Sequence, residues 1–246
     1  MLPSLLLLLC FFLLPQICPA QQSVSETARP WHSHIGIGVT MSTLGAGIEL
    51  AKPLTERSNL RTSFNMFIYS RPFDTSGITY NGELSLRSAE LAYDWFPFRN
   101  GFHLSPGLLV YDGNKITAKL FVPAGQAFRM DHKDYRSDSQ DPIAGNATIT
   151  FRKVAPAFLI GWGNLIPRKP RHFSIPFEFG VVFHGQPTLA FNMTGKGCDL
   201  QVYSCVSINN DPTAIQDIAD ERAKIKEELS DFKFYPVISI GFGYSF

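Results

Sequence analysis

Polar and charged side chains recur at alternate positions within several otherwise apolar segments of this 246-residue chain. They include guanidinium, carboxylate, imidazole and amide groups, which could act as acids and bases, hold an ion or pair with one another. In segments that form strands, alternation places such residues on one face. We interpret the set as the inward face of a closed sheet: Arg61, Asn65, Ser85, Arg87, Glu90, Asp94, Arg152, Glu178, His184 and Lys233.

The width of the expected barrel determines whether these inward side chains pair with one another or line a channel. A barrel of about eight strands has an interior just wide enough for side chains to fill it. Mixed charges in such a lumen are expected to pair into a buried network that plugs it. A narrow path for solutes is the alternative.

His103 and Ser105 form a His-x-Ser pair that could supply a base and a nucleophile. The pair resembles the arrangement in lipid A deacylases, barrels whose chemistry lies toward the outer leaflet and faces the membrane. Here both residues have inward parity and follow a turn, 97–101, that we place on the periplasmic side. No partner carboxylate can be assigned. We therefore predict hydrogen bonding in the lumen, with no catalytic residue, cofactor or metal.

Two cysteines remain after the N-terminal region, Cys198 and Cys205. A pair this close in an exported chain indicates a disulfide that pins a loop. A zinc site is the competing interpretation, but this loop contains no His or further Cys.

The N-terminus predicts export. An unbroken apolar run at 5–14 is too short to span a bilayer, and small residues follow it, so we predict a signal peptide over 1–20 that is cleaved after Ala20. Residues 21–33 are expected to form a flexible leader. The rest of the chain has no apolar run long enough for a transmembrane helix. The net charge of +1 argues against a nucleic-acid partner.

The C-terminal segment 232–246 alternates large apolar side chains with small or polar ones, and it ends on a bare Phe. A period of two predicts a strand. The segment resembles the closing strand of bacterial outer-membrane β-barrels, which serves as the recognition signal for the barrel-insertion machinery. The resemblance assigns that signal to Phe246, Tyr244, Phe242 and Ile240.

Similar alternation predicts about eight strands within a single barrel domain, 34–246. Short and long connections alternate along the chain, as in bacterial barrels with short periplasmic turns and long external loops. The short ones are 53–59, 97–101 and 165–171, and the long ones are 71–79, 112–145 and 185–231. Ten strands would result if 115–122 and 189–193 each crossed the membrane.

Three local features complete the expected fold. A change of phase between Leu86 and Ala89 predicts a β-bulge near Ser88, and segment 147–164 is long enough to form one spanning strand. The segment 212–229 predicts an amphipathic helix in the last long loop, with Asp211 as its N-cap. We expect this helix to pack on the barrel rim; a partner-binding or lumen-plugging helix is the alternative.

Together these patterns resemble small outer-membrane β-barrel proteins of Gram-negative bacteria, of the porin-like or eight-stranded class. The resemblance rests on Phe246, on the turn WFPFRNGF and on the strand FSIPFEFGVVF. It implies an all-β antiparallel transmembrane barrel, located in the bacterial outer membrane, that contacts its lipid and the insertion machinery. The function would be non-enzymatic: a structural or adhesive role through external loops, whose partner the sequence does not identify, or a narrow solute channel.

Two other classes of protein remain open at this stage. A soluble secreted β-barrel that binds an apolar ligand would place the apolar face inward and the polar face outward, and parity alone does not distinguish the faces. A lipid A-modifying enzyme would depend on His103. The composition favours the membrane barrel, since charged residues make up 17% of the chain, below the usual ~25%.

Overall fold

The computed structural model describes residues 34–75, 78–98, 100–130, 133–167, 171–199 and 204–246. The predicted signal peptide (1–20) and leader (21–33) lie outside these residues. Within the described part of the chain, no helix is both long and apolar enough to cross a bilayer.

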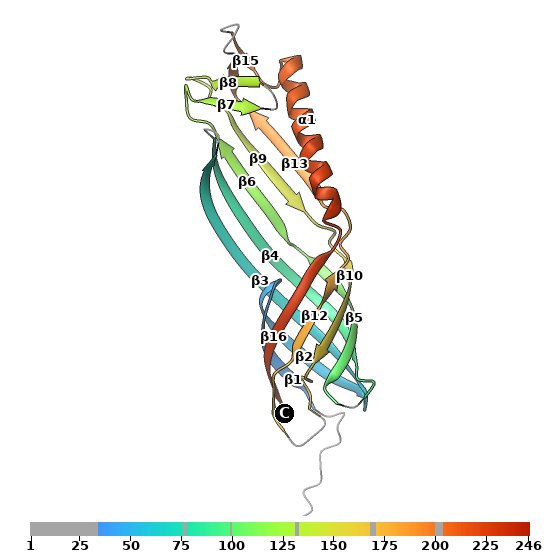
Figure 1. Ribbon diagram of the computed structural model, residues 1–246. Coiled ribbons are helices and arrows are strands. Elements are labelled where there is room, and N and C mark those ends of the chain that lie inside the picture. The colour runs from blue at the N-terminus through green and yellow to red at the C-terminus, as the bar shows by residue number, and fades with distance from the viewer. Residues whose placement is uncertain (1–33, 76–77, 99, 131–132, 168–170, 200–203) are drawn as a thin grey trace, which may run out of the picture.

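Eight antiparallel strands close into a ring, which confirms the predicted barrel (Figure 1). In ring order they are β1 (Gly36–Ser42), β2 (Gly45–Thr55), β3 (Ser58–Thr75), β4 (Ile78–Trp95), β5 (Phe102–Asp112), β10 (Ala155–Trp162), β12 (Phe177–Val182) and β16 (Tyr235–Ser245). The last strand pairs with the first along all of β1, from Gly36↔Ser245 to Ser42↔Ser239. Closure leaves no free edge in the ring, as a bilayer requires.

The ring is apolar outside, and its interior holds buried charged and polar side chains together with some apolar ones. Along β16, Ile238, Ile240 and Phe242 are between 50 and 55% exposed, whereas the alternate residues Val237 and Ser239 are buried. An apolar outer band with a polar interior is the arrangement of barrels in lipid. It is the reverse of what a soluble barrel with an apolar lumen requires, so the structure does not favour that alternative.

Strands β3 and β4 are 18 residues long and continue well beyond the ring. The near part of β4 pairs with β5, while its far part pairs with β6 (Lys115–Phe121). Strand β6 then pairs with β9 (Ala144–Thr150), and β9 with β13 (Thr188–Thr194). We call this structure, with the elements that pack on it, the extension. Strands β6 and β13 lie outside the ring, so the ten-stranded alternative is wrong.

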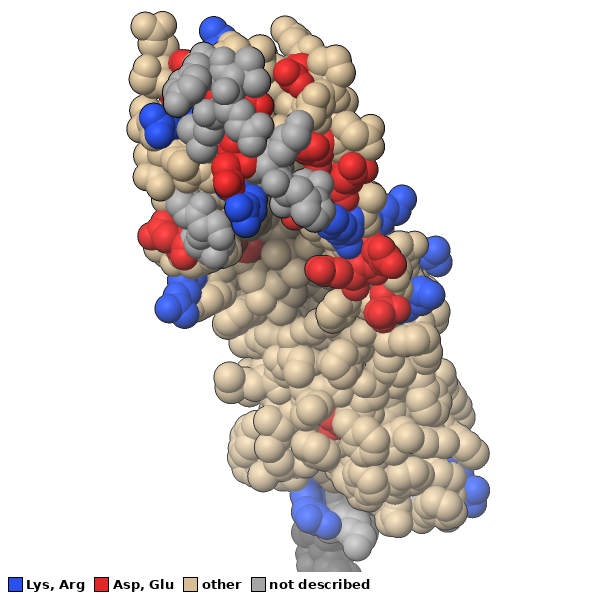
Figure 2. All heavy atoms as spheres, turned by 45° about the horizontal axis from the view of Figure 1, so that its top comes forward, with Lys and Arg blue, Asp and Glu red and all other residues tan. Residues whose placement is uncertain are grey.

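A second, smaller sheet and one helix complete the extension. The sheet contains β7 (Ala127–Met130), β8 (Lys133–Ser137), β14 (Lys196–Asp199) and β15 (Cys205–Ser207). Helix α1 (Pro212–Glu228) and the 3-10 turn η2 (Leu229–Asp231) lead back to β16. On the face shown in Figure 2, charged side chains gather over the extension, and the barrel wall below it is largely uncharged.

Helix α1 packs on the extension and not on the barrel rim. Its Asp211 N-cap is confirmed, because the carboxylate accepts the backbone N–H groups of Thr213 and Ala214. Ala214 joins a core that includes Phe128, Tyr135, Phe191 and Ile208. The Tyr135 hydroxyl donates to Asp217 at 2.7 Å, and burial together with this carboxylate raises the pKa of Tyr135. The hydroxyl therefore stays protonated and continues to donate.

Two further predictions are corrected by the strand pairing. Segment 147–164 is not one spanning strand, since it divides into β9 in the extension and β10 in the ring. The segment is divided because its two halves have different hydrogen-bonded partners. Strand β9 pairs with β6, whereas β10 pairs with β5.

The predicted bulge near Ser88 lies on the neighbouring strand. Strands β3 and β4 pair without a shift, but Ala89 pairs with Tyr111 and Glu90 pairs with Leu109. The extra residue is therefore Val110 on β5. Leu84 and Leu86 differ in phase from Leu91 because they point to the inner side.

A disulfide joins Cys198 on β14 to Cys205 on β15, as predicted. Seven positions separate the two cysteines, and closing a loop of this size stabilises the folded extension by about 2 kcal/mol.

We expect the double variant Cys198→Ser/Cys205→Ser to be cleaved faster within the extension by added protease. Its unboiled gel mobility should match that of the unaltered protein, because the ring does not contain the bond. Unchanged cleavage would show that the disulfide does not stabilise the extension.

Candidate functional site: the closed lumen

Arg61 lies at the centre of an ion network inside the ring. The strand β3 points its guanidinium inward, where only 4% of the residue is exposed. Its nitrogens contact three carboxylates: Glu49 at 3.0 Å, Asp94 at 3.1 Å and Glu178 at 2.6 Å. These acids come from β2, β4 and β12. We call these residues, with His103 and Ser105, the lumen network.

The contact between Arg61 and Glu178 crosses the whole lumen. Strands β3 and β12 are four places apart in a ring of eight, so they stand opposite each other. Their side chains meet by a charge-assisted hydrogen bond. This contact places two long charged side chains across the centre of the lumen.

His103 and Ser105 belong to the same network and have different partners. His103 Nε2 lies 2.9 Å from Glu178 Oε1, and its Nδ1 lies 3.1 Å from the carbonyl oxygen of Gly101. The Ser105 hydroxyl donates to Asp94 at 2.7 Å. Each residue is thus bound to its own carboxylate, which sequence reasoning did not identify. A nucleophile must instead be bonded to its base, so this geometry does not supply an activated serine.

Carboxylates outnumber cations in the lumen. Glu90 is also buried, at 5% exposure, and its Oε1 has no hydrogen-bond partner in the described structure. Asp94, His103 and Glu178 place ligand atoms within 4.8 Å of one another, close enough to hold a metal ion. Arg61 already donates to both of these carboxylates, so the arrangement suits a guanidinium better than a metal. A second group, Asp138 with Cys198 and Cys205, offers no thiolate because the cysteines are bonded together.

An apolar layer closes the lumen on the side of the network nearer the extension. Leu109, Leu159, Val182 and Val237 point inward from β5, β10, β12 and β16 and pack together. Leu44, from the turn between β1 and β2, completes this layer. The side chains of this layer offer no polar group to a water molecule or an ion.

The opposite end of the lumen is filled by the connection after β10. Leu165 and Ile166 fold inward and are 4% and 0% exposed. A Cβ on Gly38 would lie 2.8 Å from Leu165 Cδ1, and one on Gly243 would be closer still. Glycine at these positions gives Leu165 room inside the ring.

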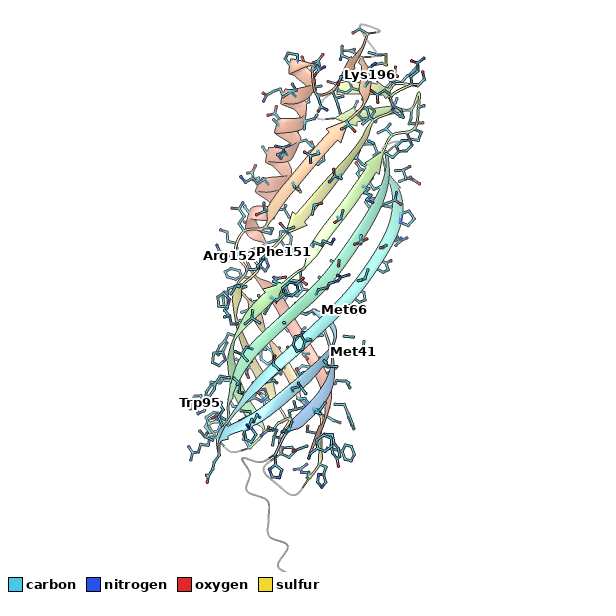
Figure 3. All side chains as sticks on the ribbon, turned by 180° about the vertical axis from the view of Figure 1, so that it is seen from behind. Met41, Met66, Trp95, Phe151, Arg152 and Lys196 are labelled. Carbon is cyan, nitrogen blue, oxygen red and sulfur yellow. A yellow bond between two sulfur atoms is a disulfide. The ribbon has the colours of Figure 1, made fainter. Side chains whose placement is uncertain are left out.

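The residues predicted to face the lumen divide into two groups. Arg61, Asn65, Ser85, Glu90, Asp94, Glu178 and His184 are buried. The prediction is wrong for Arg87, Arg152 and Lys233, which are exposed. Arg87 pairs with the outward-facing Met66, Arg152 lies between β9 and β10 at the junction of barrel and extension (Figure 3), and Lys233 precedes β16. Glu49 was missed, although its alternation with Ile48 and Leu50 could have identified it.

The four residues assigned to the insertion signal lie on the outer face of β16 or just past its end. Ile240, Phe242 and Phe246 are at least half exposed. Tyr244 contacts Phe246 with ring centroids 4.8 Å apart, and Phe173 packs against both Phe242 and Tyr244. With Trp95 and Trp162 they surround one end of the barrel with aromatic rings, as in the interfacial girdles of membrane barrels.

Comparison with known proteins identifies the fold. No family model matches the chain, and no curated protein matches it. Among solved structures, CarO of Acinetobacter baumannii has 18% identity and a TM-score of 0.51, over 85% of this chain and 96% of that one. CarO2 of the same species has 15% identity and a TM-score of 0.53, over 87% and 98%. With the closed ring, these similarities show the fold of a small Gram-negative outer-membrane β-barrel.

Replacing Arg61 with Met should destabilise the barrel strongly. Loss of one partner from a buried ion network costs about 3–5 kcal/mol, because the remaining charges stay buried without compensation. Here Glu49, Asp94 and Glu178 would all lose their cation. Denaturant unfolding in lipid vesicles measures the change.

Arg57→Met is the matched control, since Arg57 is exposed in the turn between β2 and β3. It should change stability by less than about 0.5 kcal/mol. Equal stability of both variants would show that the network does not support the ring.

Proposed function

We propose that this protein is a non-enzymatic outer-membrane barrel with a closed lumen, which anchors the extension at the cell surface for a structural or adhesive role. The observation that carries the proposal is the Arg61–Glu178 contact, which spans the ring between opposite strands. The apolar layer on one side of it and Leu165 with Ile166 on the other support the same conclusion. A barrel filled at three levels serves better as an anchor than as a pore.

The shape of the extension supports a binding role. It has its own apolar core, a disulfide and a helix fixed by a side-chain contact between Arg222 and the carbonyl oxygen of Phe191 at 2.7 Å. Charged side chains of both signs cover it on the face shown in Figure 2. Such a surface is rigid enough to present a fixed pattern of charges to a partner, with little ordering cost on binding.

A narrow solute channel is the second candidate and would need the three filled levels to open together. It is the less supported one, because a ring of eight strands offers little space beside the side chains already present. The orientation that we propose places the extension outside the cell and the C-terminus in the periplasm, which gives short turns inside and long connections outside.

Conductance across a planar bilayer tests the closed lumen. We expect the purified, folded protein to give no unitary current steps under conditions in which an open porin conducts. The physical reason is the absence of a continuous aqueous path past Arg61 and Leu109. Steady unit conductance that persists when the extension is removed by protease would contradict the proposal and favour the channel.

The role of the C-terminal residue in assembly is testable with two phenylalanines of equal exposure. Phe246 and Phe234 are both 58% exposed, at opposite ends of the last strand. We propose that the insertion machinery recognises Phe246, so Phe246→Ala should lower the amount recovered in the outer membrane of cells. Phe234→Ala should not.

Unassisted folding into vesicles controls for stability. Both variants should fold there to a similar extent, because both lose a similar apolar contact with lipid. Equal recovery of the two variants from cells would contradict recognition of Phe246.

A further inference from the structure

A pocket lies where the barrel joins the extension. Its volume is about 140 Å³, and most of its wall is apolar, with Leu84 and Leu86 from β4, Leu109 from β5 and Val182 from β12. Phe151, at the junction of barrel and extension in Figure 3, forms another part of the wall. An apolar cavity of roughly 150 Å³ is large enough to bind benzene, so this one suits a single small ring or a short alkyl chain.

Asp112 gives this pocket a charged group. The residue lines the pocket and is only 5% exposed. Its Oδ1 accepts the backbone N–H of Asn114 at 2.9 Å, and its own N–H donates to the carbonyl oxygen of Lys153 at 2.8 Å. Among the described residues, no ion pair to its carboxylate is found within 4.0 Å. A buried carboxylate is normally paired, so Asp112 retains capacity for a cation.

His184 adds a second acceptor. It is 4% exposed and also lines the pocket. Its Nδ1 lies 2.8 Å from the carbonyl oxygen of Gly185, a contact that requires Nδ1 to carry the proton. In the neutral ring Nε2 is then left as an acceptor. Phe151 packs edge-on against the imidazole at 4.7 Å and holds its orientation.

We propose that this pocket binds a small apolar primary amine in its ammonium form. The hydrocarbon part occupies the wall formed by the leucines, and the ammonium donates to Asp112 and to His184 Nε2. None of the lining residues is Lys or Arg. A ligand that carries its own carboxylate would place it near Asp112 with no Lys or Arg to pair with, so we expect zwitterionic amino acids of similar size to bind more weakly.

This inference goes beyond the proposed function and does not depend on it. The pocket lies on the extension side of the apolar layer, with Leu109 and Val182 shared between the two. It is open to a ligand whether or not the lumen conducts. Conductance and ligand binding can therefore fail separately.

Benzylammonium is the probe for a direct test, with the full chain folded in zwitterionic lipid nanodiscs. Methyl signals of Leu84, Leu86 and Leu109 report the pocket by NMR. We expect saturable shifts with benzylammonium, weaker shifts with uncharged toluene and none with phenylacetate. Equal binding of phenylacetate and benzylammonium would overturn the assignment of Asp112, and no saturable shift with benzylammonium would overturn the site.

Substitutions separate charge from shape. Asp112→Asn should weaken benzylammonium binding about tenfold or more, which is the loss expected for a charged hydrogen bond. It should leave toluene binding intact, which shows that the variant is folded.

Leu86→Trp should fill the cavity and abolish binding of both probes. Glu83→Gln is the matched control, because Glu83 is an exposed acid beside Leu84 on the same strand. An equal effect of Asp112→Asn and Glu83→Gln would contradict the proposal.

Discussion

The rest of this structure depends on one requirement, that every backbone group inside the hydrocarbon of a bilayer be hydrogen-bonded. Each N–H and C=O group within a bilayer needs a partner in the protein, and the pairing of β16 with β1 removes the last free edges of the ring. Closure at eight strands also fixes the width of the lumen, which must then be filled by side chains. Three sets of side chains fill the lumen at three levels. They are the ion network around Arg61, the inward leucines, and Leu165, which the neighbouring glycines admit.

Unequal strand length explains how one sheet forms both barrel and extension. Strand β1 has seven residues, whereas β3 and β4 have 18 each. Beyond the point where β5 ends, β4 still needs a hydrogen-bonded neighbour, and β6 takes that place. The chain therefore turns from β5 directly into β6, and the extension grows from the wall of the barrel without a separate linker. The pocket lies at this change of partner, where the leucines of β4 face inward above the closed ring.

Alternation in the sequence predicted the class of fold because the outer face of each strand must be apolar. It predicted the polar residues of the lumen less well, since parity shows which residues share a face but not where along the chain the ring ends. Lys233 shares the inward parity of β16 but precedes that strand, so it lies beyond the lumen. Arg87 was assigned to the wrong face, because Leu84 and Leu86 point inward and Arg87 faces outward beside Met66. The carboxylate partner of His103 could not be predicted, because Glu178 on β12 meets His103 on β5 only through the ring order, which alternation does not contain. The helix cap at Asp211 was predictable, being local.

Two buried carboxylates in this barrel, Glu178 and Asp112, differ in how many partners within the protein balance their charge. Glu178 has a guanidinium at 2.6 Å and an imidazole at 2.9 Å, so the ring itself compensates its charge. Asp112 is equally buried, yet it has only a backbone N–H and a histidine whose Nδ1 proton is donated elsewhere. The first arrangement stabilises the native ring and needs nothing from outside. The second leaves a buried carboxylate without an ion pair among the described residues, beside an apolar cavity in which a bound cation would supply one.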